Sequence, residues 1–274
     1  MSKMIRNLVC SLAAVLVLGA HGTVLAQARE EAKLLVATEV LDELRAQRDQ
    51  QIPERLLQRA YGVAVIPDVL KGAFFIGARH GTGVLSVRDS RGRFSNPVFV
   101  QITGGSFGAQ FGAQATDIVL VFTTRRGVDG IAGGKLSLGA GASVAAGPLG
   151  RQAEAAAAID AEIYAYSRAR GLFAGIALDG TALTIDNKAN RNFYNKRDVL
   201  PSDITSGSVT SSSENTRRFL AALALSTGET ADGTGPAAAP AAQPAAPVDH
   251  SAHQGAGEVQ TFPMEDPAPG KEPR

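Results

Sequence analysis

Residues 104–114 read Gly104-Gly105-Ser106-Phe107-Gly108-Ala109-Gln110-Phe111-Gly112-Ala113-Gln114, so glycine recurs inside a strand-like stretch rather than only between strands. Glycines inside strands usually mark bulges, sharp coiling or the close approach of another backbone. These features bend a sheet toward closure. The stretch therefore predicts a strongly curved, glycine-rich, mainly antiparallel sheet or a barrel-like core.

Short runs rich in β-branched and aromatic residues surround this stretch and predict the other strands. They lie at residues 63–66, 73–76, 84–87 and 98–102, and then around 136–146, 156–166 and 173–178. Residues 89–93 have the composition of a hairpin turn. Residues 118–122 are apolar on both faces, which predicts a central, fully buried strand. In residues 159–166 Ile and Ala alternate with Asp, Glu and Tyr, which predicts one buried and one exposed face.

Helices are predicted on both sides of the strands, so the expected fold class is α+β. Residues 29–48 have the spacing of an amphipathic helix. Its apolar positions are Leu34, Ala37, Leu41 and Leu44. Pro53 suits the first position of a second short helix. After the strands, residues 187–196 predict a short helix, and Ser211 with Glu214 has the spacing of a capping box that opens a C-terminal helix.

The first 26 residues have the order of features found in a secretory signal peptide. Lys3 and Arg6 precede an apolar run over residues 8–20, and residues 24–26 offer small or modest side chains for cleavage. The run is shorter than the roughly 20 residues that span a bilayer as a helix. We therefore expect cleavage near Ala26 and a mature protein that is periplasmic or secreted.

The remaining chain divides by composition. Residues 226–274 are rich in Pro and Ala with hardly any large apolar side chain, which predicts a disordered tail. Residues 27–225 then form one domain with a formal charge of about +4, too mild to indicate nucleic acid binding. The only cysteine, Cys10, lies in the signal segment, so disulfides and thiol chemistry are not expected of the mature protein.

Signatures of cofactor binding fail when they are checked residue by residue. A nucleotide-binding loop around residues 133–135 would need Gly at 129 and Ser or Thr at 136, where the chain has Asp129 and Leu136. His80 is the one histidine of the domain, so an ordinary zinc site is not predicted. We expect no cofactor, no metal and no nucleotide.

Catalytic patterns are also weak, and the expectation is a protein that is not an enzyme. Gly104, Ser106 and Gly108 satisfy the Gly-x-Ser-x-Gly elbow, but an elbow must be followed by a helix and this one precedes a strand-like stretch. A serine hydrolase using Ser106 is kept as a remote alternative. Asp117 and Asp129 flank the apolar strand at 118–122 and the turn that follows it, and Asp160 and Glu162 would share one face of a strand. Two carboxylates two positions apart on a strand could do acid–base work if they were buried together, but a solvated face is the usual interpretation.

Five segments, in order, resemble the SYLF lipid-binding domain family over roughly residues 50–210. They are AYGVAVIP (60–67), GARHGTGVL (77–85), TGGSFGAQ (103–110), GPLGR (147–151) and YSRARGLFAG (166–175). The resemblance implies a lipid-binding module, directed to phosphoinositides in the eukaryotic members that also associate with actin, and exported in many bacterial members. It also implies that the Gly-Gly-Ser-Phe-Gly segment is structural.

The chain departs from the family pattern at two places. Phe94 stands where the family often has Trp before Ser-x-Pro, a change expected to keep the packing. The helix at 29–48 carries more acidic than basic residues, whereas a membrane-surface helix normally has an excess of Lys and Arg. This helix is therefore expected to pack on the sheet.

The expected function is a non-enzymatic lipid-binding module of the bacterial cell envelope that contacts anionic lipid or phospholipid head groups peripherally. The alternative is a periplasmic structural or scaffolding protein that binds another envelope protein. Basic residues near predicted turns are the candidate lipid contacts, and solubilising arginines are an equally good explanation of them. The candidates are Arg79, His80, Arg88, Arg91, Arg93, Arg125 and Arg126.

Overall fold

The computed structural model of the protein describes residues 25–46, 52–73, 77–89, 91–106, 112–149, 161–169, 172–178 and 180–228. The strands are β1 (Gly62–Ala73), β2 (Gly77–Val87), β3 (Val98–Ser106), β4 (Gly112–Phe122), β5 (Lys135–Ser137), β6 (Val144–Ala146), β7 (Ile163–Ala169), β8 (Leu172–Gly175) and β9 (Thr181–Ile185). The helices are residues 25–46, α2 (Glu54–Gln58), α3 (Arg125–Ala132), α5 (Asn187–Tyr194), α6 (Pro201–Thr205) and α7 (Glu214–Ser226).

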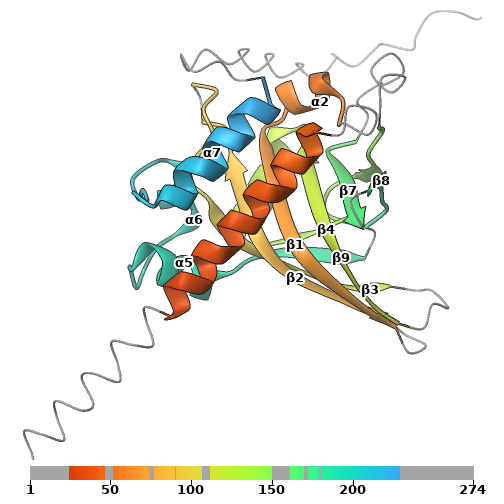
Figure 1. Ribbon diagram of the computed structural model, residues 1–274, viewed down its shortest axis with the longest axis horizontal. Helices are drawn as coiled ribbons and strands as arrows, with labels where there is room; N and C mark the ends of the chain where they lie inside the picture. Colours follow the sequence, from red (N-terminus) through yellow and green to blue (C-terminus); the bar gives the residue numbers. More distant parts are fainter. Residues whose placement is uncertain are drawn as a thin grey trace, which may run out of the picture. The chain divides into compact units, whose positions relative to one another are not determined.

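The strands form one strongly curled sheet in the order β5-β9-β3-β2-β1-β4-β7-β6, with β8 paired to β7 (Figure 1). Every pairing is antiparallel except that of β6 with β7. The predicted α+β class and the curved, mainly antiparallel sheet are confirmed. Residues 118–122 are completely buried and lie within an inner strand, as predicted.

A bulge in β1 bends the centre of the sheet. Pro67 and Asp68 lie opposite the single residue Asp117 of β4. Pro67 has no N–H to donate, and Asp68 adopts a left-handed conformation with φ of 48°. The Asp68 N–H donates to Asp117 Oδ1 at 3.0 Å, so the bulged strand keeps a hydrogen bond at this point. Two residues against one shorten the ladder locally and increase the twist.

Glycines in β2 make room for that bulge. A Cβ atom on Gly83 would lie 2.2 Å from the carbonyl oxygen of Val65 and 2.5 Å from the Cα of Ile66. A Cβ on Gly81 would lie 2.6 Å from Val69 Cγ2. The two strands therefore approach more closely than side chains on β2 would allow, which explains why this predicted strand contains glycine in its interior.

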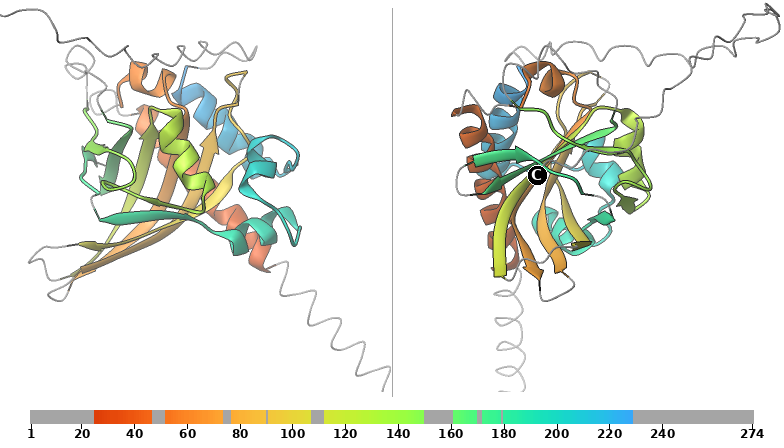
Figure 2. Two further views of the ribbon diagram at one scale, coloured as in Figure 1. Left: turned by 180° about the vertical axis from the view of Figure 1, so that it is seen from behind. Right: turned by 90° about the vertical axis from the view of Figure 1, so that its right-hand side faces the viewer.

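The N-terminal helix (residues 25–46) and α7 lie side by side on one face of the sheet, and α3 lies on the opposite side (Figures 1 and 2). The N-terminal helix buries one apolar stripe, as its spacing predicted. The buried residues of this stripe are Leu34, Ala37, Val40, Leu41 and Leu44. The expectation that this helix packs on the sheet is therefore confirmed.

Asp117 also fixes the position of the N-terminal helix. Its Oδ2 accepts a hydrogen bond from Arg168 Nε of β7 at 2.6 Å, and Arg168 Nη1 forms an ion pair with Glu43 of the helix. Asp117 is buried, so its charge requires these partners. One carboxylate thus joins the β1 bulge, β7 and the N-terminal helix.

The Asn190 side-chain amide attaches helix α5 to β3, because it pairs with the backbone of Phe99 as a neighbouring strand would. Asn190 Oδ1 accepts from the Phe99 N–H at 2.9 Å, and Asn190 Nδ2 donates to the Phe99 carbonyl at 3.1 Å. The Tyr194 hydroxyl donates to the Pro97 carbonyl at 2.7 Å. Asp186 caps the helix by accepting from the Ala189 N–H. The short helix predicted at residues 187–196 is confirmed.

The alternating burial predicted for residues 159–166 is wrong in the described part of that segment. Ile163, Tyr164, Ala165 and Tyr166 are all buried. β7 lies inside the sheet, and the segment after β6 covers the face that carries Tyr166, because Gly147 and Pro148 lie against that ring. The Tyr166 hydroxyl donates to the Pro148 carbonyl at 3.2 Å, so the polar group of this buried side chain has a hydrogen-bond partner.

Two further predictions need correction. The cap of α7 is Ser213 rather than Ser211, because Ser213 Oγ accepts from the N–H groups of Asn215 and Thr216. The run at 136–146 is not one strand but two, β5 and β6, separated by a turn. The signal segment up to residue 24, residues 74–76 and 150–160, and the tail from residue 229 lie outside the described residues.

A pair of glycine substitutions tests the origin of the curvature. Gly83→Ala places a methyl group against the backbone of β1 and should destabilise the domain by about 1 to 3 kcal/mol. The control is Gly105→Ala in β3, where nothing lies within 4 Å of the added Cβ, so stability should stay the same or rise by up to about 1 kcal/mol. Urea unfolding of both variants measures the difference. Equal stabilities would contradict the explanation.

Candidate functional site

The strand register brings two predicted arginine groups to the same end of the sheet. Gly62, at the start of β1, pairs with Val87 at the end of β2 and with Phe122 at the end of β4. Strands are about 4.8 Å apart, so the segments that leave β2 and β4 start about 10 Å from each other. We call this region the basic end. Its predicted members are Arg88, Arg91, Arg93, Arg125 and Arg126.

The turn after β2 holds the first three of these arginines. Asp89 Oδ1 accepts hydrogen bonds from the N–H groups of Arg91 and Arg93 at 2.8 and 2.9 Å, so the predicted hairpin turn is confirmed. Arg88 lies over the Phe94 ring at 4.5 Å and donates to the Gly92 carbonyl. Arg88 is therefore mainly a structural residue, whereas the side chains of Arg91 and Arg93 are exposed.

The first turn of α3 holds the other two. Thr124 caps this helix by accepting from the Gly127 N–H at 3.1 Å. The Arg125 and Arg126 side chains are 73% and 85% exposed. Arg125 lies 4.0 Å from Asp129, and Arg126 lies 3.7 Å from Glu162. Both guanidinium groups therefore face solvent with only long, weak ion pairs.

Helix α2 adds two arginines that sequence reasoning missed. The chain passes from α2 directly into β1, and the Arg88 N–H donates to the Tyr61 carbonyl at this junction. Arg55 and Arg59 of α2 are exposed and lie at the same end as the β2 turn. Sequence alone gave no reason to group them with residues about 30 positions later, since only the register brings these segments together.

Positive charge exceeds negative charge at the basic end. Among the described residues, this end carries seven arginines but only four carboxylates, those of Glu54, Asp89, Asp129 and Glu162. Exposed ion pairs of this kind contribute only about 0 to 1 kcal/mol each. An anionic surface can therefore displace them at little cost.

Arg79 and His80 do not belong to this group, so the seven predicted residues do not form one cluster. Arg79 lies within β2, nine residues before Arg88, which corresponds to about 30 Å along an extended strand. His80 is exposed on the face of the sheet that carries the N-terminal helix, and Arg79 is half-buried on the other face.

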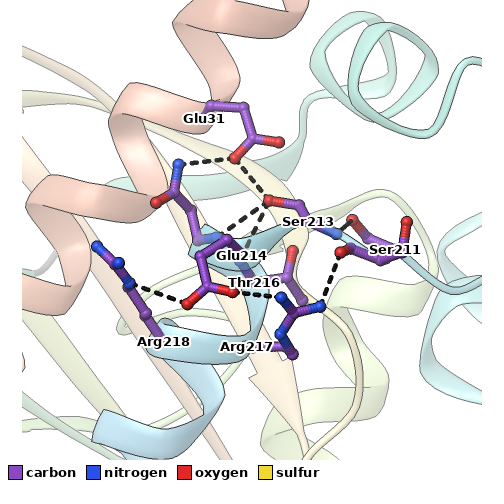
Figure 3. Close-up of polar contacts among 9 residues, drawn as sticks. Glu31, Ser211, Ser213, Glu214, Thr216, Arg217 and Arg218 are labelled. Carbon is purple, nitrogen blue, oxygen red and sulfur yellow. Dashed lines mark hydrogen bonds and ion pairs between the residues drawn. The ribbon is translucent and has the colours of Figure 1, made fainter.

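The N-terminal helix is held at its beginning by a polar contact with α7 (Figure 3). Glu31 Oε2 accepts from the Ser213 hydroxyl at 2.7 Å and from Asn215 Nδ2 at 2.9 Å. Ser213 is the residue that caps α7, so the Glu31 carboxylate lies at the positive end of that helix. Together with the Glu43–Arg168 pair, this contact attaches the helix at both ends.

The remaining predicted chemistry finds no support in the described residues. Ser106 is the last residue of β3, and β4 begins at Gly112, so the strand–turn–helix order of a nucleophile elbow is not met. Asp117, which flanks the central apolar strand, is a buried structural residue. No group of three His, Cys, Asp or Glu side chains in the described segments is placed to hold a metal ion.

Comparison with known proteins finds a family relationship over the middle of the chain. The family model for Ysc84, described as "Las17-binding protein actin regulator", matches residues 103–225. The chain contains a Ysc84-family domain, the SYLF domain. It is 38% identical over 164 residues to SH3 domain-containing YSC84-like protein 1 of Xenopus laevis, covering 59% of this chain and 49% of that protein.

A second relative is LAS seventeen-binding protein 3 of Saccharomyces cerevisiae, 40% identical over 151 residues, which cover 53% of this chain and 33% of that protein. The chain thus spans a third to a half of the length of these curated relatives. No solved structure matches it significantly. No helix among the described residues is long and apolar enough to cross a membrane.

The geometry explains two of the motifs that identified the SYLF domain. A Cβ on Gly147 would lie 2.0 Å from Tyr166 Cζ, so the Gly-Pro-Leu-Gly segment must begin with glycine to admit the tyrosine ring. Phe94, which replaces the usual Trp, keeps its aromatic face under Arg88. The description of the family refers to Las17 binding and actin regulation, and the name of the yeast relative refers to LAS seventeen binding.

Proposed function

We propose that this SYLF domain is a non-enzymatic, peripheral lipid-binding module that contacts anionic head groups through the basic end. The observation that carries the proposal is the register of Val87, Gly62 and Phe122, which gathers exposed arginines from α2, the β2 turn and α3 at one end. The excess of arginine over carboxylate there supports attraction to phosphate-bearing surfaces.

The size of the expected interaction is modest. Each basic residue near an anionic membrane surface contributes about 1 kcal/mol, and the contribution decreases within a Debye length. The exposed side chains Arg91, Arg93, Arg125 and Arg126 are the best placed to act in this way. The proposal is therefore weak, salt-sensitive adsorption rather than insertion.

The N-terminal helix is not part of the proposed contact. Its apolar stripe is buried against the sheet, and Glu31 and Glu43 attach it to α7 and β7. Inserting this stripe into a bilayer would expose the matching apolar surface of the sheet to water. Adsorption through the arginines leaves the fold unchanged.

A scaffolding role is the second candidate, and the names of the relatives favour it. The yeast relative is named for binding LAS seventeen, and the family description names an actin regulator. In this chain, such a role would have an envelope protein as the partner. Binding to vesicles made of purified lipid alone separates the two candidates, because a scaffold needs its protein partner.

We place the mature protein in the periplasm or outside the cell, on the strength of the signal-peptide pattern in residues 1–26. Mass spectrometry of the protein recovered from the periplasmic fraction should give a chain that begins at Gln27. Recovery of the full-length chain from the cytoplasm would contradict this location.

Vesicle co-sedimentation tests the basic end. The double variant Arg91→Gln/Arg126→Gln removes two exposed charges, and its partition onto vesicles rich in phosphatidylglycerol should decrease about 30-fold at low salt. Wild-type protein should be released at about 0.5 M salt, where the Debye length is about 4 Å.

The matched control for this experiment is Arg217→Gln/Arg218→Gln, which removes the same charge from exposed positions on α7. It should bind the vesicles nearly as well as the wild-type protein. Equal losses in the two double variants would mean that only net charge matters. Wild-type binding that is indifferent to lipid charge would refute the proposed function.

A further inference from the structure

The chain leaves the folded domain at the basic end. Helix α7 ends beside α2 (Figure 1). A Cβ on Gly228, the last described residue, would lie 3.4 Å from Gln58 Nε2 and 3.6 Å from Glu54 Oε1 of α2. The same short helix carries the exposed side chains of Arg55 and Arg59. The residues that follow Gly228 therefore start next to two arginines of the basic end.

The last turn of α7 fixes this exit point. The Ser226 hydroxyl donates to the Ala222 carbonyl at 2.7 Å, and Thr227 Oγ1 donates to the Leu223 carbonyl at 3.0 Å. Both of these polar side chains are buried. Gly228 has a φ of 67°, the left-handed conformation that commonly ends a helix. The chain is therefore held against α2 up to the residue before the tail.

The tail from residue 229 onward is acidic, which is opposite in sign to the basic end. It holds seven Asp and Glu side chains against Lys271 and Arg274, a formal charge of −5. Six of the seven carboxylates come before Lys271 along the chain. They are Glu229, Asp232, Asp249, Glu258, Glu265 and Asp266. The segment that starts at the basic end thus carries the charge that the basic end lacks.

The length of the tail is sufficient for its carboxylates to reach the arginines. Asp249 follows Gly228 by 21 residues, and a flexible chain of that length spans about 25 Å on average. The segments that leave β2 and β4 start only about 10 Å apart. Tethering also gives each carboxylate an effective concentration of about millimolar. Exposed ion pairs that are individually weak can therefore form.

We propose that the acidic tail competes with anionic membranes for the arginines of the basic end and so weakens membrane binding. The inference rests on the proposed function, because it concerns the regulation of the same site. Arg93, Arg125 and Arg126 make ion pairs of only 3.6 to 4.0 Å within the domain, so their guanidinium groups can exchange partners. A membrane of low charge does not displace the tail, whereas a highly charged membrane does. The tail thus sets a threshold of surface charge for binding.

Replacement of the six tail carboxylates by amides (Glu→Gln and Asp→Asn) in the full mature chain tests this inference. Two probes are used at low salt. Vesicles rich in phosphatidylglycerol are followed by co-sedimentation, and a fluorescent heparin oligosaccharide is followed by anisotropy. The amide variant should bind both probes about 3- to 10-fold more tightly than the wild-type protein. The difference should disappear at about 0.5 M salt, where charges are screened.

Matched backgrounds show where the tail acts. In Arg91→Gln/Arg126→Gln, the increase in affinity caused by the amide tail should fall to about half or less, because fewer arginines remain to compete for. In Arg217→Gln/Arg218→Gln, which has the same net charge, the increase should equal that in the wild-type domain. A tail of wild-type composition in scrambled order should weaken binding as the wild-type tail does. An unchanged midpoint of urea unfolding in the amide variant excludes an effect on folding.

The two probes separate this inference from the proposed function. Unchanged affinity of the amide variant for heparin would overturn the inference, and so would an equal increase in all three backgrounds, which is the effect of net charge alone. Tight binding by the scrambled tail would overturn it too, since the competition depends on charge. Tighter heparin binding with the expected dependence on background, but no vesicle binding by any variant, would refute the proposed function and still support competition by the tail.

Discussion

The buried carboxylate of Asp117 is the contact on which the arrangement of this domain depends. It accepts the Asp68 N–H at the bulge of β1 and the Nε of Arg168 in β7, and Arg168 in turn pairs with Glu43 of the N-terminal helix. The bulge that bends the sheet and the N-terminal helix are therefore linked through one side chain. A buried charge of this kind is costly to leave unpaired, so the three elements are stable only together.

This arrangement separates the structural charges of the domain from those available for binding. Two carboxylates of the N-terminal helix attach it, Glu31 to the first turn of α7 and Glu43 to β7. The arginines of the basic end, in contrast, make only long or exposed contacts with carboxylates. This separation of structural charges from exposed charges is the basis of the proposal for the ligand of the domain.

Much of the fold could be predicted from local patterns, because helices, apolar strands and interior glycines each have a direct physical signature. The N-terminal helix, the buried strand at 118–122 and the curved sheet were accessible in this way. The burial of Tyr164 and Tyr166 was not, because it depends on which distant segments lie over the faces of β7, as Gly147 and Pro148 do over the Tyr166 ring. The same limit applies to the site. Sequence singled out the basic residues of the turns, but it could not add Arg55 and Arg59 or separate Arg79 from the rest, since only the strand register decides which ends meet. The structural role of Asp117 was missed for the same reason.

We propose that the domain binds anionic membranes as a rigid body, through the basic end and with its N-terminal helix still packed on the sheet. Hydrogen exchange of the mature protein, measured with and without phosphatidylglycerol vesicles, tests this most directly. We expect vesicles to slow exchange in residues 88–93 and 125–126 and to leave the exchange of the protected amides of residues 34–44 unchanged. Faster exchange in residues 34–44 on vesicles, with no change in the turn after β2, would show that the helix leaves the sheet and would contradict the account.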